Sequence, residues 1–447
     1  MPKEKYNLKE GLNDLRKLIP RWAQTDDSPP PPPHLSRMFY QAELGGLTLS
    51  REEATEYERV LQKLTLDNET KLVHTRAEVD KLLSTAVLKA LDILGKEPST
   101  TLQERIDREV DAIKTELTSA PVEWDVWRDI EGLIIPAEGF QFGNVFFCHR
   151  QHEEALVAKK SVETRINSYK PNIAKWYRDE LKCFERTDSN WVLCRVKVKA
   201  AGGESARHLA KIELDAAIPI LNFFASFMPL TDSFPYAFLR ETSDGKVVTD
   251  IALTDGTRWN WQMTHLRIIA GLNVNDFQKN DVMWKSVQRI SAMLIAPKNN
   301  FNERLLAGTK WAGKGASARN KEEAFLFYAI ALEALILGPR NRQQLSYQLR
   351  LRVGQLLGPD KTRKIKWRDL TRHLYELRNA IAHSGKNDIA SIDLQDLRFI
   401  VQSCIEIILC HVEFANISTE ETLDKWFEDS LMNALDTPAK SASAEPT

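Results

Sequence analysis

The spacing of hydrophobic residues divides the chain into three parts. In the first part, apolar residues recur every three or four positions, which is the period of one helix face, as in Leu102, Ile106, Val110, Ile113 and Leu117. Capping boxes precede two of these segments, Ser50 with Glu53 and Thr101 with Glu104. This pattern predicts an N-terminal helical segment over residues 34–120.

From about Pro121 onward, some stretches alternate between apolar and other residues, as β-strands do. The stretch "WVLCRVKVKA" alternates apolar and other residues from Val192 to Val198, and "FQFGNVFF" is also typical of strands. Between strand-like stretches, "ARHLAKIELDAAIPILNFFASFM" favours a helix, which we expect Pro219 to kink or break. Residues 121–280 are therefore expected to form an α+β domain.

Beyond Asp281 only helical patterns recur, separated by loops that contain glycine and proline. Six helices are expected: Met283–Leu294, Glu303–Gly313, Lys321–Leu337, Gln343–Leu357, Trp367–Ser384 and Leu394–Phe414. Residues 281–435 should then be an all-helical domain, and residues 436–447 a disordered tail. Residues 1–33 are expected to form an arm, with at most one short helix, that ends in the polyproline linker "SPPPPPH". The predicted fold class is a multi-domain α+β protein.

Composition places few limits on function. The chain has 447 residues, a formal net charge of −1 and 43% hydrophobic residues, which suits a globular protein and argues against a wholly basic nucleic-acid coat protein. Its five cysteines are scattered and show no CxxC spacing, so neither a disulfide framework nor a cysteine zinc site is indicated. The longest apolar run, 324–337, is too short to span a membrane. We expect a cytoplasmic protein that needs no metal or cofactor.

Charge is strongly segregated near the C-terminus. Residues 340–386 contain twelve lysines and arginines against three acids, a net charge of +9. Residues 413–447 contain eight acids against two lysines, a net charge of −6. A dense basic band can bind a polyanion such as nucleic acid. It can equally be a solvated helical face that pairs with the acidic end, and charge alone leaves both interpretations open.

Within the basic band stands the stretch "YELRNAIAHSGK". At about 100° per residue, Asn379 and His383 lie roughly 40° apart on one helix face, whereas Arg378 lies about 140° from His383. Arg378 and His383 could therefore meet across a groove or with a symmetry-related copy. Gly385 is a plausible residue just after the helix end, which puts His383 in the last turn. A histidine there can transfer protons near neutral pH or can simply cap the helix.

Glu333 interrupts the apolar stretch "AFLFYAIALEALIL". A carboxylate on such a helix is costly to bury unless it is paired or protonated. Arg378 is the expected partner. The pair could be a buried salt bridge that fixes helix packing, or it could take part in catalysis.

These segments together resemble the HEPN superfamily (higher eukaryote and prokaryote nucleotide-binding), in particular its Apea-like branch. The R-x4-H signature is matched from Arg378 to His383, and "AFLFYAIALEALIL" and "LSYQLRLRVGQLLG" resemble the flanking helices. The resemblance covers Phe301 to about Phe414. It implies a compact, usually dimeric helical bundle in which two such motifs face each other. Active members are metal-independent endoribonucleases, many of them toxins or phage-defence effectors.

By this resemblance Arg378 and His383 would be the catalytic pair, Asn379 the polar residue usual after the arginine, and Glu333 a carboxylate that acts in some members. RNA supplies its own 2′-hydroxyl nucleophile, so proton transfer by histidine and phosphate binding by arginine suffice in principle. The N-terminal regions would sense a trigger, such as a phage-derived partner, or restrain a homodimer or higher even oligomer. Residues expected to bind the RNA substrate are Arg340, Arg342, Arg350, Lys364, Lys366, Arg372, Tyr375 and Lys386. The alternative is a non-catalytic HEPN module that binds RNA or nucleotide or acts as a scaffold.

Overall fold

The structure is a computed structural model of the whole chain, and it forms two compact units, residues 1–126 with 197–212 and residues 127–196 with 213–447. The predicted boundary at 120/121 lies close to the first division, whereas residues on both sides of the boundary predicted at 280/281 belong to the second unit. The structure describes residues 8–23, 37–41, 44–66, 74–92, 95–169, 182–185, 191–227, 238–239, 248–254, 258–264, 272–296, 299–318, 320–337, 344–384, 389–414, 417 and 419–436.

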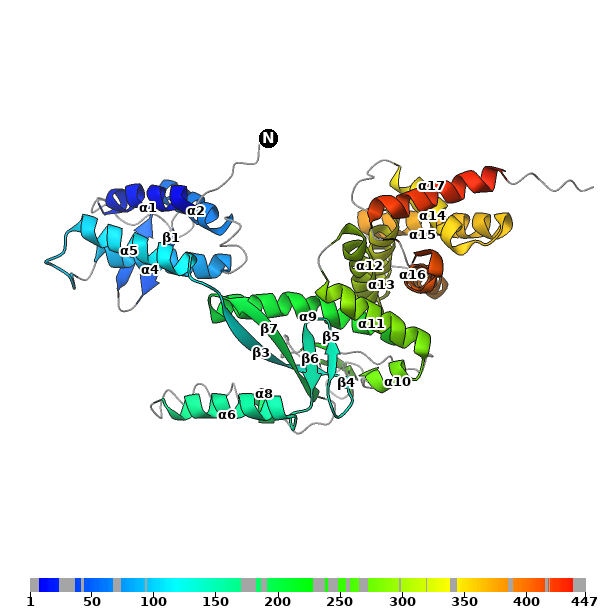
Figure 1. The fold of residues 1–447 in the computed structure, drawn as a ribbon, viewed down its shortest axis with the longest axis horizontal. Helices are drawn as coiled ribbons and strands as arrows, with labels where there is room; N and C mark the ends of the chain where they lie inside the picture. Colours follow the sequence, from blue (N-terminus) through cyan, green and yellow to red (C-terminus); the bar gives the residue numbers. More distant parts are fainter. Residues whose placement is uncertain are drawn as a thin grey trace, which may run out of the picture. The chain divides into compact units, whose positions relative to one another are not determined.

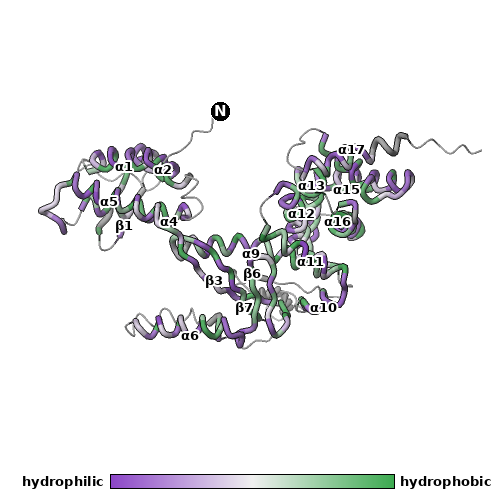
Figure 2. Tube along the Cα trace, in the orientation of Figure 1, coloured by the Kyte–Doolittle hydropathy of each residue, from purple (hydrophilic) through white to green (hydrophobic). Residues whose placement is uncertain are grey.

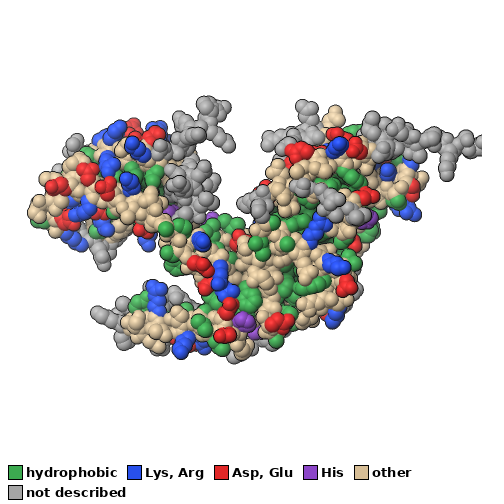
Figure 3. All heavy atoms as spheres, in the orientation of Figure 1, with side chains coloured by type: hydrophobic (Ala, Val, Ile, Leu, Met, Phe, Trp, Pro, Cys, Tyr) green, Lys and Arg blue, Asp and Glu red, His purple; other side chains and the backbone are tan. Residues whose placement is uncertain are grey.

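The first unit contains the helices α1 (Leu8–Trp22), α2 (Arg51–Leu66), α4 (Arg76–Leu91) and α5 (Leu102–Leu117) (Figure 1). Both predicted capping boxes are present, and the Thr101 box begins α5 at the expected residue. Figure 2 shows hydrophilic and hydrophobic residues alternating along these helices. On the face in Figure 3, acidic and basic side chains of this unit are interspersed.

Two details of the first unit differ from expectation. Helix α1 is not an arm, because Leu15, Ile19 and Trp22 are buried in the same core as the residues of α2, α4 and α5. Its apolar residues recur every three or four positions, so it buries one face like its neighbours. The segment expected to be helical also contains an antiparallel hairpin, β1 (Arg37–Gln41) with β2 (Gly45–Leu49). The polyproline stretch lies outside the described residues.

A five-stranded sheet follows, in the order β5-β6-β7-β3-β8. Its strands are β3 (Val122–Glu131), β5 (Phe140–Phe142), β6 (Val145–Cys148), β7 (Trp191–Ala200) and β8 (Phe238–Leu239). Gly143 turns the β5–β6 hairpin with a φ of 58°, a conformation that favours glycine. Short pairs are β4 (Leu133–Ile134) with β11 (Leu272–Asn273), and β9 (Val248–Thr254) with β10 (Arg258–Thr264). Helices α6 (Glu153–Asn167) and α8 (Lys182–Glu185) lie between strands β6 and β7 in the sequence.

Helix α9 (Gly203–Ala225) continues through Pro219, so the expected break does not occur. Proline lacks one backbone donor, but packing holds the helix together on both sides of it. The Pro219 carbonyl lies so close to Gly313 that a Cβ there would overlap its oxygen. At the end of α9, the Ser226 carbonyl accepts hydrogen bonds from Arg398 and Gln402. The divisions between the two units fall within β3, β7 and α9.

The remainder of the second unit is helical, as expected. It contains α10 (Val274–Gln278), α11 (Asp281–Ile295), α12 (Asn300–Ser317), α13 (Lys321–Ile336), α14 (Leu345–Leu357), α15 (Lys361–Ser384), α16 (Ser391–Cys410), the 3-10 helix η3 (Val412–Phe414) and α17 (Glu420–Asp436). All six predicted helices are present. Helix α15 begins six residues before the predicted Trp367, because the Asp360 carboxylate accepts a hydrogen bond from the Arg363 backbone N–H at 2.9 Å.

Helix α13 is packed against α12, α15 and α16. Its C-terminal carbonyls are held by two buried arginines: Arg304 donates to the Leu335 oxygen at 2.7 Å and Arg352 to the Ile336 oxygen at 3.0 Å. Arg352 also donates to Asp424 of α17 at 2.7 Å. Positive charge at a helix C-terminus is favourable, so this cluster fixes the end of α13. In the described part of the chain, no helix combines the length and apolar character needed to cross a membrane.

Candidate functional site

Helices α13 and α15 bring Glu333 and Arg378 together. The Arg378 Nε lies 3.2 Å from Glu333 Oε1, and each side chain is 24% exposed. The predicted pairing is therefore confirmed, although the pair is partly rather than fully buried. Part of the guanidinium remains open to a ligand.

Neighbouring side chains hold Arg378 in place but do not satisfy all of its N–H donors. Its Nη1 donates to Asn379 Oδ1 at 3.3 Å, and its guanidinium lies 5.7 Å from the centre of the Tyr375 ring. The contact between Arg378 Nε and Glu333 Oε1 is close but poorly aligned, because neither atom makes a hydrogen bond of good geometry. The attraction between the two side chains is therefore mainly Coulombic.

Burial dominates the electrostatics of this cluster. It raises the pKa of Glu333 above its ordinary value, although Arg378 and a hydrogen bond from Tyr375 act in the opposite direction. Burial and the nearby Glu333 carboxylate also raise the pKa of Tyr375, so its hydroxyl keeps its proton at neutral pH. The tyrosine was expected only to stack on a base. Its interaction with Glu333 was not foreseen, since nothing in the sequence marks Tyr375 as a neighbour of that carboxylate.

His383 lies in the last turn of α15 and is exposed. Within the described residues, no hydrogen bond or ion pair joins it to Arg378 or Asn379. Gly385, the expected end signal, lies outside those residues. One copy of the chain thus presents an exposed imidazole on the same helix as Arg378, five residues further along and about 140° round the helix axis.

The expected RNA-binding residues are only partly assembled. Lys364 and Tyr375 lie within about 60° of Arg378 around α15, whereas Lys366 lies about 120° away on the other side. Arg372 is exposed and 3.8 Å from Glu376, a surface pair of small energy. Arg350 lies on α14. The remaining three, Arg340, Arg342 and Lys386, lie outside the described residues.

Local carboxylates offset part of the basic band. Arg352 binds Asp424 and caps α13, and Arg368 lies 2.9 Å from Asp369. These arginines were counted as basic surface, but Arg352 is buried and structural. Its role could not be read from the sequence, because Asp424 is 72 residues away.

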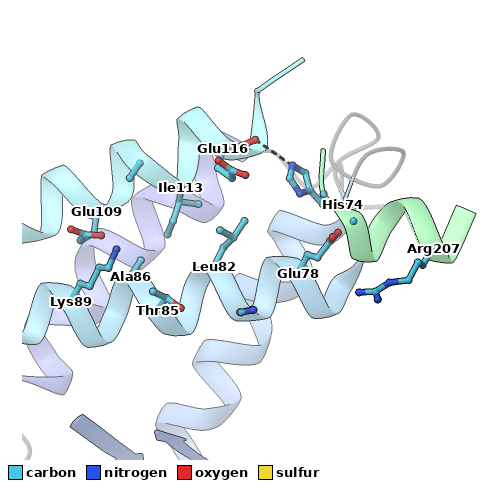
Figure 4. A pocket seen from close by; sticks show the side chains of 14 residues that line it. His74, Glu78, Leu82, Thr85, Ala86, Lys89, Glu109, Ile113, Glu116 and Arg207 are labelled. Carbon is cyan, nitrogen blue, oxygen red and sulfur yellow. Dashed lines mark hydrogen bonds between the residues drawn. The ribbon is translucent and has the colours of Figure 1, made fainter. Parts of the chain in front are cut away.

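A separate cavity of about 560 Å³ lies in the first unit, between α4, α5 and the start of α9 (Figure 4). Glu78 stands at one end, where its carboxylate accepts hydrogen bonds from the backbone N–H groups of Thr75 and Ser205 and so caps both α4 and α9. His74 is bonded through Nε2 to the Glu116 carbonyl at 3.3 Å. These polar groups serve the packing of the unit, and none belongs to the predicted site.

No group of three or more His, Cys, Asp and Glu side chains is placed to hold a metal ion among the residues that the structure describes. At the candidate site, α13 and α15 present arginine, histidine, tyrosine and carboxylate side chains. Comparisons of this chain with protein-family models, with curated proteins and with solved structures found no match.

Proposed function

We propose that the chain is a metal-independent endoribonuclease of the HEPN type. The observation that carries the proposal is the pairing of Glu333 with Arg378, whose guanidinium stays partly exposed on the helix that also presents His383. An arginine held in this way offers a fixed charge to a phosphate, and an exposed imidazole can exchange protons with a bound nucleotide.

The reaction requires two proton transfers and no water. An imidazole accepts the proton of the ribose 2′-hydroxyl, the 2′-oxygen forms a bond to phosphorus, and the bond from phosphorus to the 5′-oxygen breaks. The leaving oxygen takes a proton, and the products are a 2′,3′-cyclic phosphate and a 5′-hydroxyl. Arg378 stabilises the negative charge that grows on the phosphate oxygens. In this scheme Glu333 orients Arg378 and does not touch the substrate.

A second copy of the chain completes the proposed site. One copy supplies one His383, whereas the reaction uses one group that accepts a proton and one that donates it. Helix α13 supports such an assembly, because it is apolar on nearly all sides yet leaves Phe327, Ile330 and Ala334 partly exposed. We therefore propose a homodimer through this face. Light scattering should show a dimer or a larger even oligomer, and a strict monomer that still cuts RNA would contradict the proposal.

The test of activity is the chemistry of the products. The purified chain, incubated with cellular RNA in EDTA, should yield fragments that end in 2′,3′-cyclic phosphate and begin with a 5′-hydroxyl. Fragments that form only when Mg²⁺ is added, or that carry 5′-phosphates, would assign a different mechanism.

A second function is favoured by one feature of the same site. Arg378 already contacts Glu333, Asn379 and Tyr375, which suits a structural pair in a module that binds RNA without cutting it. Such a module would bind RNA with the same affinity after His383→Ala and would produce no fragments.

A further inference from the structure

The sequence Tyr-x-Leu-Arg occurs on two neighbouring helices. It reads Tyr347-Gln-Leu-Arg350 on α14 and Tyr375-Glu-Leu-Arg378 on α15. Residues three positions apart lie about 60° apart around a helix, so each tyrosine and its arginine share one face.

The two occurrences have the same local geometry. In each, the leucine points into the core, with Leu349 and Leu377 both buried. In each, the guanidinium lies over the tyrosine ring, at 5.2 Å from the centre for Arg350 and 5.7 Å for Arg378. These contacts are cation–π pairs, which hold an arginine in place while leaving N–H groups free.

The two helices that carry these pairs are packed against each other. Leu349 of α14 and Tyr375 of α15 line one small cavity, together with residues of α13 and α16. Helices α14 and α15 pack tightly, because a Cβ on Gly354 would stand 2.7 Å from the Lys364 carbonyl oxygen. The Tyr347 pair therefore lies on a helix that is packed tightly against the helix of the candidate site.

The pairs differ in what remains available to a ligand. Arg378 is offset by Glu333, whereas Arg350 has no carboxylate partner in the described part of the chain. The side chain of Tyr347 is also open, with the residue 49% exposed. An uncompensated guanidinium favours a phosphate, and an open aromatic ring can stack on an unpaired base.

We propose that Tyr347 and Arg350 form a second nucleotide-binding subsite, in which the ring stacks on a base and the guanidinium binds an adjacent phosphate. Arg350 covers one face of the ring, so the base occupies the other. Stacking of this kind needs a base free of its pairing partner, so the ligand is single-stranded RNA. The identity of this ligand rests on the proposed function.

Binding can be measured without cleavage. A short fluorescent 2′-O-methyl oligoribonucleotide lacks the nucleophile, so the full-length chain can be titrated into it and followed by anisotropy. Tyr347→Leu should weaken binding by roughly 5- to 150-fold, the range for loss of one stacked base, whereas Tyr347→Phe should bind like the wild type. Phe399→Leu is the matched control, because Phe399 on α16 is a similarly exposed aromatic residue, at 54%, and should change nothing.

Salt dependence separates the two roles. Arg350→Ala should weaken binding and lower the slope of log affinity against log salt concentration by about 0.7, the value for one phosphate contact on a single strand. Tyr347→Leu should leave that slope unchanged. The proposal is overturned if the wild type does not bind the oligonucleotide, if Tyr347→Leu binds like the wild type, or if Phe399→Leu weakens binding equally.

Failure of this subsite and failure of the nuclease proposal give different results. If Tyr347→Leu and the wild type bind equally while RNA is still cut in EDTA, only the subsite is wrong. If Tyr347→Leu loses affinity while no RNA is cut, the subsite stands and the function is binding.

Discussion

Replacing Glu333 by glutamine removes the charge of this side chain and keeps its shape. Two unit charges 3.2 Å apart attract by about 5 kcal/mol at an effective dielectric constant of about 20. Burial opposes this attraction, and the raised pKa of Glu333 shows that burial has the larger effect. At neutral pH we therefore expect Glu333→Gln to change the free energy of unfolding by less than about 1 kcal/mol.

The raised pKa of Glu333 also fixes the direction in which the stability of the wild type changes with pH. Because the folded-state pKa of Glu333 is raised, the protonated carboxyl contributes stability that is fully present below its unfolded pKa. This contribution is lost as the pH rises through the folded-state pKa. The wild type should thus lose stability relative to Glu333→Gln as the pH rises from about 4, near the unfolded pKa, through the raised folded-state pKa.

Urea unfolding at pH 4 and at pH 7, followed by tryptophan fluorescence, measures the difference in the free energy of unfolding between the wild type and Glu333→Gln. Arg378→Met is the control, since it leaves a partly buried carboxylate without its cation. It should cost more than the glutamine variant, roughly 1–3 kcal/mol at neutral pH. A loss of about 3 kcal/mol or more in Glu333→Gln at neutral pH, or a wild-type advantage that grows with pH, would refute the reasoning.

Other substitutions test the packing. Gly313→Ala should lower the free energy of unfolding by about 1–3 kcal/mol in urea titrations, because the added Cβ would meet the Pro219 carbonyl. Gly95→Ala tests only the cost of the positive φ, because no other atom lies within 4 Å of the position of its Cβ. Glu78→Ala removes a carboxylate that caps two helices and should cost about 1–3 kcal/mol; an unchanged midpoint would contradict that role. Arg372→Ala should cost less than about 1 kcal/mol, since its ion pair is exposed.

Local signals predicted the helices well. The Thr101–Glu104 box and the three-to-four spacing of apolar residues gave α5 at its observed bounds. The alternation of apolar and other residues likewise predicted β7. The start of α15 was placed too late, at Trp367, because Asp360 was not recognised as a cap. Such signals work because the interactions behind them join residues only a few positions apart.

Contacts between distant residues were harder to predict. The Glu333–Arg378 pair was foreseen, since a carboxylate on an apolar helix requires a cation and the basic helix offered one. The position of α1 in the core and the use of Arg352 as a cap were missed, because each depends on a tertiary neighbour. The function implied by the R-x4-H motif stays a prediction.

The central claim is that His383 and Arg378 cut RNA without a metal. It is tested most directly by the cleavage rate in EDTA of the wild type and of His383→Ala, with His373→Ala as the control. His373 is a second exposed histidine on α15, 3.0 Å from Asp393. His383→Ala should lower the rate by about 10²- to 10⁴-fold, whereas His373→Ala should cut RNA at the wild-type rate. Equal rates for wild type and His383→Ala would contradict the claim.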